Sequence, residues 1–342
     1  MSDRISVVVP YRGRGVNLRI ALAALADQRD PGEVEVILGV LDDDEMDGIH
    51  REFRDRLDLV IVRGSGPWRV AAARNLALRQ ASGRTVVLMD ADMALPPGCL
   101  RDLREAHDGT ACLVGQMVDY DNNTGDVSSV DVRPYEHHRK ILEDLQETGP
   151  GDLDPRMRTP HVIPWSFAWT ALIALPRAAA VDFDEHFAGY GVEDLEWAYR
   201  VARVGTPIVM GERFFGLHLP HVRDVAANRR TEGPNYRYFL RTWPDHDVEL
   251  ACAFGDFEAN ELATDFREVI GGREFVVARE GRRLTVGADV TRKADETLPL
   301  VGLALPYDDH SLDGVTIGEE ITRLPARYRD KVLAEARRVT RP

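Results

Sequence analysis

The first 92 residues alternate short apolar segments with helix-like segments, and this order constrains the fold more than any other feature of the chain. Each apolar segment has the nearly continuous hydrophobicity of a strand that is buried on both faces. The segments between them carry one apolar stripe, as amphipathic helices do. The order predicts an α/β fold built on a mostly parallel sheet. The expected strands are residues 5–9, 34–41, 59–62 and 85–89, and the expected helices begin at a cap on Asn17 and at about Trp68.

Polar residues follow three of these strands at the point where each strand ends. They are Tyr11-Arg12, Asp42-Asp43 and the Asp-Ala-Asp segment that contains Asp90 and Asp92. Ligands of parallel α/β sheets bind beyond the carboxyl ends of the strands. In an extended segment Asp90 and Asp92 project to the same side, and their oxygens suit Mg²⁺ or Mn²⁺ carrying a diphosphate. Taken alone, the motif is also typical of a solvated acidic turn, so other parts of the chain must decide.

The composition is typical of a globular protein and argues against a protein that binds nucleic acid. The chain has 342 residues, enough for two domains, with 44% hydrophobic and 29% charged residues. Its net charge of −14 argues against nucleic acid or an anionic membrane as a partner. No segment approaches the ~20 apolar residues of a membrane span, and no signal peptide precedes the first strand. Together with three isolated cysteines, Cys99, Cys112 and Cys252, this predicts a cytoplasmic location.

The segment 120–164 shows weaker patterns. We expect a turn at 121–125 and a helix at 135–146, before glycines and prolines interrupt regular structure. Such an irregular stretch is typical of a lid or binding loop. Trp165 and Trp169 follow it and can offer flat faces on which an acceptor sugar stacks, although for Trp169 a place in the core is at least as well supported.

A second acidic motif lies where a glycine-flanked loop enters a helix. It places Glu193 and Asp194 at the helix N-terminus, where negative charge is favoured and where simple capping is the alternative role. After a strand at 207–210, a loop carries His218 and His221. Either histidine can be a metal ligand, although a lone histidine in a loop usually is not.

These motifs, in this order, resemble the GT-A glycosyltransferases of family 2. The second half of the pattern is similar to chondroitin-polymerase-type galactosyltransferases and polypeptide GalNAc-transferases. The resemblance covers roughly residues 4–224. It is carried by the segments 7–10, 73–75, 81–83 and 88–92, and then by 183–185, 191–196 and Arg200.

The resemblance implies a GT-A fold, with a Rossmann-like mixed sheet, and a divalent cation, Mn²⁺ or Mg²⁺. Asp92 would be the firmer metal ligand, joined by Asp90 and by His218, with His221 as the second choice. Asp90 would also lie near the ribose. The implied nucleotide-binding residues are Pro10, Tyr11 and Arg12 around the base, Asp42 or Asp43 at the base edge, and Arg74 at the nucleotide or its phosphates.

The resemblance also implies the catalytic groups. Asp194 would be the general base, and Glu193 would hold donor or acceptor hydroxyls. Retaining GalNAc-transferases carry Glu-Asn at this point, so Asp194 favours an inverting enzyme. The expected reaction moves a sugar from a nucleotide sugar, most often UDP-linked, to a soluble saccharide or natural product. The expected acceptor residues are Trp165, Trp169, Tyr190 and Gly191.

The last hundred residues differ in character, and we expect domains at 1–245 and 246–342. A strand is expected at 248–251 and a helix at 257–270, and residues 304–316 and 333–342 resemble part of a class I methyltransferase. No G-x-G-x-x-G loop is present to cradle a cofactor, so this part is expected to be non-catalytic, packing on the transferase or mediating a homodimer.

Two other functions fit parts of the pattern. A nucleotidyltransferase also pairs a parallel sheet with metal-binding carboxylates, but it usually needs a glycine-rich basic loop after the first strand, and residues 11–15 match one only faintly. The other alternative is a catalytically silent module that binds a nucleotide sugar. The intact acidic motifs argue against it.

Overall fold

A computed structural model describes residues 4–43, 45–119, 127–287 and 293–342, and these residues form two compact units. Unit 1 comprises residues 1–158 and 164–229, and unit 2 comprises residues 159–163 and 230–342. The predicted boundary after residue 245 lies within unit 2. The turn predicted at 121–125 lies outside the described residues.

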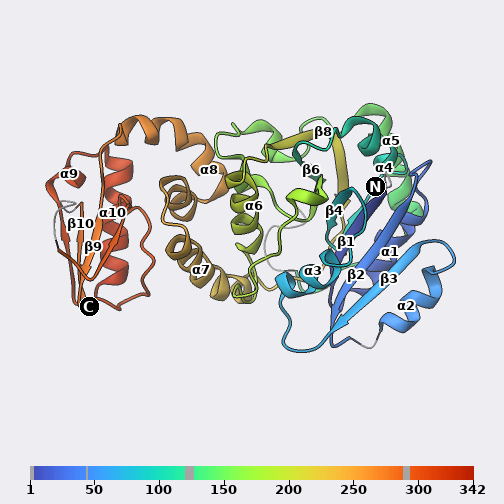
Figure 1. Ribbon diagram of the computed structural model, residues 1–342, viewed down its shortest axis with the longest axis horizontal. Coiled ribbons are helices and arrows are strands. Elements are labelled where there is room, and N and C mark those ends of the chain that lie inside the picture. Colours follow the sequence, from blue (N-terminus) through green and yellow to red (C-terminus); the bar gives the residue numbers. More distant parts are fainter. Residues whose placement is uncertain (1–3, 44, 120–126, 288–292) are drawn as a thin grey trace. The chain divides into compact units, whose positions relative to one another are not determined.

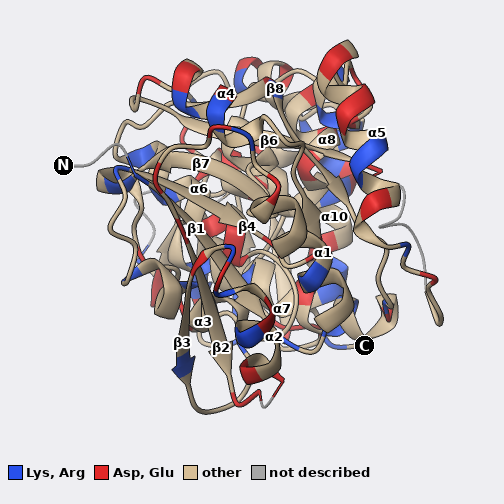
Figure 2. Ribbon diagram, turned by 90° about the vertical axis from the view of Figure 1, so that its right-hand side faces the viewer, with Lys and Arg blue, Asp and Glu red and all other residues tan. Residues whose placement is uncertain are grey.

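Unit 1 is built on an eight-stranded mixed sheet with the order β3-β2-β1-β4-β7-β6-β8-β5. Strands β3, β2, β1 and β4 are parallel and lie side by side (Figure 2), whereas β7 is antiparallel to both β4 and β6. The predicted α/β fold with a Rossmann-like mixed sheet is confirmed. The strands are β1 (Ile5–Tyr11), β2 (Val34–Leu41), β3 (Asp58–Gly64), β4 (Thr85–Met89), β5 (Met93–Ala94), β6 (Cys112–Val118), β7 (Leu172–Pro176) and β8 (Ile208–His218).

The strand register brings the predicted polar segments to one edge of the sheet. Tyr11 at the end of β1 is opposite Val40 of β2, and Leu41 at the end of β2 is opposite Gly64 of β3. Strand β4 runs parallel to β1 and ends at Met89, directly before the Asp-Ala-Asp segment. The carboxyl ends of the parallel strands therefore meet as the sequence predicts.

Helices cover both faces of this sheet (Figure 1). Apolar residues of α1 (Gly15–Ala26), α2 (Met46–Phe53) and α4 (Cys99–Ala106) share one core with the odd-numbered residues of β1. Helix α3 (Val70–Leu78) packs against β1 and β2. A Cβ added at Gly39 of β2 would stand 1.8 Å from the Ala73 carbonyl oxygen, so only glycine permits this approach.

Two local predictions in unit 1 are wrong. Asn17 does not cap α1, because the helix starts two residues earlier and Arg14 occupies the cap position. The Asn17 side chain instead donates to the Pro220 carbonyl oxygen at 3.0 Å. His218 does not lie in a loop but at the end of β8, where burial and pairing with β5 and β6 favour strand.

The irregular middle of the chain contains helices as well as loops. The predicted helix after residue 134 is confirmed as α5 (Tyr135–Thr148), and three short 3₁₀ helices follow it along the chain. These are η2 (Pro155–Arg158), η3 (Pro164–Phe167) and η4 (Arg177–Ala179). Helix α6 (Glu193–Arg203) then begins at the predicted acidic pair.

Unit 2 contains α8 (His246–Ile270), α9 (Glu319–Thr322), α10 (Ala326–Val339) and a four-stranded sheet with the order β11-β9-β10-β12. Its strands are β9 (Val277–Glu280), β10 (Arg283–Val286), β11 (Glu296–Leu298) and β12 (Gly314–Ile317). Helix α7 (Val225–Thr242) contains the division point between the units. The strand predicted at 248–251 is wrong: Asp245 caps α8, and buried Glu249 accepts backbone N–H groups of residues 301–303 from a helical position.

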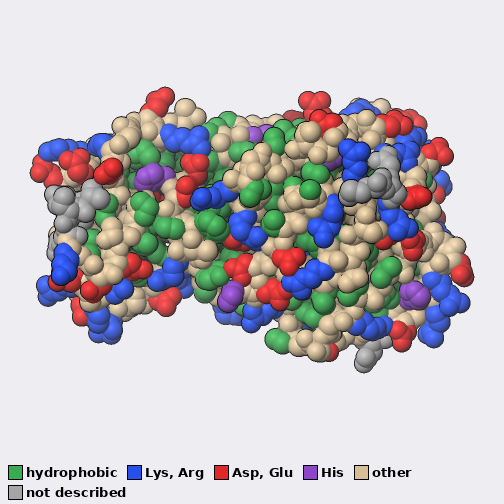
Figure 3. Space-filling view, in the orientation of Figure 1, with side chains coloured by type: hydrophobic (Ala, Val, Ile, Leu, Met, Phe, Trp, Pro, Cys, Tyr) green, Lys and Arg blue, Asp and Glu red, His purple; other side chains and the backbone are tan. Residues whose placement is uncertain are grey.

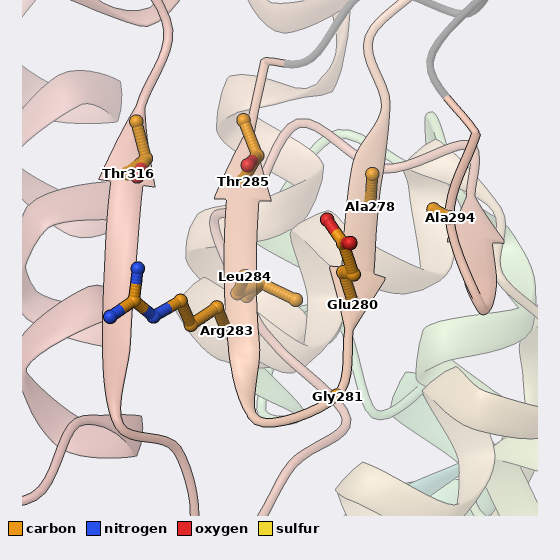
Figure 4. Close-up of a pocket in the computed structure, with 8 residues that line it drawn as sticks. All are labelled: Ala278, Glu280, Gly281, Arg283, Leu284, Thr285, Ala294 and Thr316. Atoms are coloured by element: carbon orange, nitrogen blue, oxygen red, sulfur yellow. The ribbon is translucent and has the colours of Figure 1, made fainter.

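A depression of about 400 Å³ lies on the sheet of unit 2. The residues that line it include Glu280, Arg283, Thr285 and Thr316, which come from three neighbouring strands (Figure 4).

No helix among the described residues is long and apolar enough to cross a membrane. Acidic and basic side chains are interspersed over the face shown in Figure 3.

Candidate active site

Asp92, His218 and His221 form a cluster at the carboxyl end of the unit 1 sheet. One donor atom from each of the three side chains lies within 4.8 Å of the others. His221 Nδ1 is 3.2 Å from Asp92 Oδ2, and His218 Nε2 is 3.9 Å from Asp92 Oδ1. Short strand β5 makes this possible, because Met93 pairs with His218 and the Leu219 N–H donates to the Asp92 carbonyl at 2.7 Å.

The three side chains have the chemistry of a divalent-cation site. Asp92 is buried, which acts to raise its pKa, but the nearby imidazoles and the Arg14 guanidinium outweigh burial and hold that pKa below its ordinary value. Burial lowers the pKa of His221 to about 4 and also lowers the pKa of His218. Carboxylate oxygen and imidazole nitrogen are both common ligands of divalent cations.

Asp90 stands outside this cluster and belongs to a second charged group. Its Oδ1 accepts a hydrogen bond of 2.9 Å from Arg74, and its side chain is 33% exposed. Arg74 is buried and donates through its other terminal nitrogen to Glu193 Oε1, also at 2.9 Å. Burial acts to lower the pKa of Arg74, but Asp90, Glu193 and Asp194 outweigh it and raise that pKa. Arg74 therefore links the Asp-Ala-Asp segment to the acidic start of α6.

The loop before α6 has a strained backbone. Val192 has a φ of 77°, which is rare for a β-branched residue, and Gly191 before it has a φ of 90°. This geometry places Glu193 and Asp194 at the first two positions of the helix. Glu193 is buried, and among the described residues none donates a hydrogen bond to its Oε2. Asp194 is half-buried, and its Oδ1 accepts the Leu195 N–H.

Asn75 connects two motifs that lie more than a hundred residues apart. Its side-chain amide donates to the Phe183 carbonyl at 2.9 Å and to Glu185 at 2.8 Å. Its carbonyl oxygen accepts the Phe183 N–H at 2.7 Å. Since Arg74 and Asn75 are adjacent on α3, this one helix turn fixes both the segment before α6 and the acidic pair itself.

We expect Asn75→Ala to lower the free energy of unfolding by about 2–4 kcal/mol, because two buried backbone groups of Phe183 lose their partner. Urea denaturation of the full chain measures this loss. The matched control is Arg79→Gln, which removes an exposed ion pair with Asp182 between the same helix and the same segment. Its cost should stay below about 1 kcal/mol. Equal effects of the two substitutions would show that the buried Asn75 contacts do not hold the segment.

The predicted nucleotide-binding residues lie near the ends of β1 and β2. Pro10 and Tyr11 are buried, and the Tyr11 hydroxyl donates to Glu45 at 3.0 Å. Arg12 is exposed and stacks over the Trp68 ring at 5.8 Å. Of the two candidate base-reading carboxylates, Asp42 is exposed and accepts the Gly66 N–H, whereas Asp43 is half-buried and accepts the Glu45 N–H.

The four predicted acceptor residues differ in accessibility. Trp165 is buried in η3 and packs edge-on against Tyr199, with ring centroids 5.4 Å apart. Trp169 is half-buried, and the Arg156 guanidinium lies 4.4 Å from its ring centroid. Tyr190 is exposed, beside half-buried Gly191 in the strained loop. Tyr190 and Gly191 lie next to the acidic pair in sequence, whereas Trp165 is enclosed in the core.

Sequence reasoning missed Arg14, which donates a hydrogen bond to Asp92. The pattern gave only a weak indication, an arginine between two glycines after the first strand. Sequence reasoning also placed His221 below His218 as a metal ligand, whereas both histidines lie near Asp92. The spacing of residues 218 and 221 was visible, but the turn that brings both rings together was not.

Comparison with known proteins gives a consistent result. A family model described as glycosyl transferase family 2 matches residues 6–156. Two validoxylamine A glucosyltransferases, from Streptomyces hygroscopicus subsp. limoneus and subsp. jinggangensis, are each 30% identical over 284 residues. These alignments cover 75% of this chain and 62% and 67% of the relatives, so the chain spans about two thirds of their length or slightly less. A chondroitin synthase from Escherichia coli is 29% identical over 231 residues, covering 59% of this chain and 33% of that protein.

Proposed function

The chain belongs to glycosyl transferase family 2, and from this premise we propose that it moves a sugar from a nucleoside diphosphate sugar to an acceptor hydroxyl, with inversion at the sugar carbon. The observation that carries the proposal is the arrangement in unit 1. An Asp-His-His cluster and a pair of carboxylates stand beyond the same sheet edge, and Arg74 joins the Asp-Ala-Asp segment to the pair.

We assign Asp92, His218 and His221 as the ligands of a divalent cation, Mn²⁺ or Mg²⁺. Such a cation supplies positive charge to the oxygens of a departing diphosphate. Asp90 accepts a hydrogen bond from Arg74, and we propose that it contacts the donor and does not bind the metal. This differs from the expectation of the sequence, where Asp90 was also a ligand.

Asp194 is the proposed general base. The acceptor oxygen bonds to the anomeric carbon of the donor sugar, the bond from that carbon to the diphosphate breaks, and the hydroxyl proton moves to the Asp194 carboxylate. Asp194 is half-buried at the start of α6, so a substrate can reach it. Glu193 is neutralised at Oε1 by Arg74, and its Oε2 can accept a sugar hydroxyl.

Nucleotide recognition is assigned to the ends of β1 and β2. Arg12 and the exposed Asp42 are positioned to contact a base, with Asp43 as the alternative to Asp42. Pro10 and Tyr11 shape the strand end from the core, since both are buried. Arg74 acts in this proposal through Asp90 and Glu193, because both of its terminal nitrogens already donate to carboxylates.

The acceptor is proposed to be a soluble saccharide or a saccharide-like natural product. Two relatives are glucosyltransferases named for validoxylamine A, and another is a chondroitin synthase. We propose Tyr190 and Gly191 as acceptor residues, a choice supported by the exposure of Tyr190, and Trp169 offers a half-buried ring. The cytoplasmic location, the division into a transferase and a non-catalytic methyltransferase-like part, and a homodimer remain predictions.

A donor screen tests the proposed function. Purified protein is incubated with UDP-, GDP- and dTDP-glucose and with UDP-galactose and UDP-GlcNAc, each with Mn²⁺ or with EDTA. We expect slow release of UDP and free sugar from one UDP-sugar, and none with EDTA. Formation of a nucleotide sugar and pyrophosphate from a nucleoside triphosphate and a sugar 1-phosphate would instead support a nucleotidyltransferase. Binding of UDP-sugars with no turnover toward a panel of saccharide acceptors would support a silent module.

A further inference from the structure

Arg14 forms an ion pair with the proposed metal ligand Asp92. Its Nη1 donates to Asp92 Oδ2, the same oxygen that lies 3.2 Å from His221 Nδ1. The two partners come from distant parts of the chain, the cap position of α1 and the segment between β4 and β5. They also differ in accessibility, because the Arg14 side chain is 44% exposed and that of Asp92 only 3%.

The backbone of Arg14 is held in place while its side chain reaches into solvent. The Leu18 N–H donates to the Arg14 carbonyl at 2.9 Å, in the first turn of α1. The next residue, Gly15, lies against the Glu45 carboxylate, which would have to move to admit a Cβ there. Glu45 is itself held by Tyr11 and Arg19. The base of the Arg14 side chain is thus fixed beside the site, and rotation about its side-chain bonds can redirect the guanidinium.

The ion pair with Arg14 reduces the electrostatic cost of burying the Asp92 carboxylate. A buried carboxylate without a compensating charge is costly. Arg14 supplies one positive charge to Asp92 and leaves the pair neutral. A divalent cation bound by Asp92 would make that contribution unnecessary, and two cations competing for one carboxylate oxygen repel each other.

We propose that Arg14 is a positioning residue that neutralises Asp92 in the metal-free protein and turns to the donor diphosphate when a divalent cation takes its place. The inference rests on the proposed function, since it needs Asp92 to be a metal ligand. A guanidinium suits both positions, because its planar array of N–H groups matches carboxylate and phosphate oxygens alike.

The charges of the two states agree with this exchange. A nucleoside diphosphate sugar brings two negative charges at its diphosphate, which a divalent cation balances. When the sugar departs, the nucleoside diphosphate carries an additional negative charge near pH 7. Arg14 beside the diphosphate offsets the charge that develops there, and such stabilisation is strongest in a site that excludes water.

The test compares wild type with Arg14→Gln and Arg14→Lys. Mn²⁺ alone is titrated by calorimetry and by electron paramagnetic resonance, and UDP is then titrated at saturating Mn²⁺. For Arg14→Gln we expect Mn²⁺ alone to bind about fivefold to tenfold more tightly, because its competitor is gone. UDP should bind about tenfold more weakly, because its guanidinium partner is gone. Arg14→Lys should restore the wild-type Mn²⁺ affinity and recover only part of the UDP affinity.

Two controls separate this inference from the proposed function. Arg29→Gln removes an exposed arginine that follows α1 and pairs with Glu143, and it should leave both affinities unchanged. Asp92→Asn should abolish Mn²⁺ binding. If it does, while Arg14→Gln binds Mn²⁺ as wild type does or more weakly, the exchange is overturned and the metal site stands. If Asp92→Asn still binds Mn²⁺ like wild type, the metal site itself is overturned, and the Arg14 inference with it.

Discussion

Asp194→Asn is expected to lower kcat by about 10²–10⁴-fold while changing the Kd of the UDP-sugar by no more than about twofold. Asparagine has nearly the same shape as aspartate and can still accept the Leu195 N–H, so the start of α6 should keep its conformation. It cannot take a proton from the acceptor hydroxyl. The loss should therefore appear in the chemical step and not in donor binding. Transfer is measured with a saturating donor and the acceptor found by screening, and donor binding is measured by calorimetry.

The matched control is Asp182→Asn, which removes one negative charge from the surface of the same unit. Asp182 is half exposed and pairs with Arg79, and nothing places it in the transfer reaction. Its kcat should remain within about twofold of wild type, since exposed ion pairs contribute little. If Asp194→Asn retains near-normal turnover, Glu193 becomes the next candidate for the base. Its Oε1 already accepts a hydrogen bond from Arg74, so Oε2 is the oxygen left to take the proton.

The parts of the fold that follow from local pattern were predictable from the sequence. The four parallel strands are continuous apolar segments, and their carboxyl ends lie at one edge because parallel pairing leaves no other arrangement. The helix after residue 134 and the start of α6 were also visible from periodicity and charge. These features depend on neighbours a few residues away.

The errors and omissions depend on contacts between distant residues. Residues 248–251 read as a strand from their apolar character, but the Asp245 cap and the buried Glu249 contacts to residues 301–303 favour a helix. The role of Arg74 was also not visible, because Asp90 and Glu193 come from different elements. The sequence could place each charged residue at a strand or helix end, but it could not show which charges would pair.

The metal site likewise depends on residues that are distant in sequence. Removing its carboxylate gives the second large effect that we expect. Asp92→Ala should weaken Mn²⁺ binding by more than about 100-fold and abolish metal-dependent binding of the UDP-sugar. Asp92 is the only carboxylate of the cluster found among the described residues, and the two imidazoles alone provide no negative charge to a dication. Calorimetry with Mn²⁺, and then with UDP-sugar and Mn²⁺ together, measures both effects.

Asp90→Asn is the matched control, since it alters the other carboxylate of the same motif. Its Arg74 contact places Asp90 outside the cluster, so Mn²⁺ alone should bind it as tightly as wild type. His218→Ala and His221→Ala should each weaken Mn²⁺ binding by about 10-fold or more if both rings are ligands. An effect confined to His218 would restore the ranking that the sequence favoured. UDP-sugar binding that survives EDTA in the wild type would contradict the metal assignment as a whole, because the diphosphate would then be held by arginines alone.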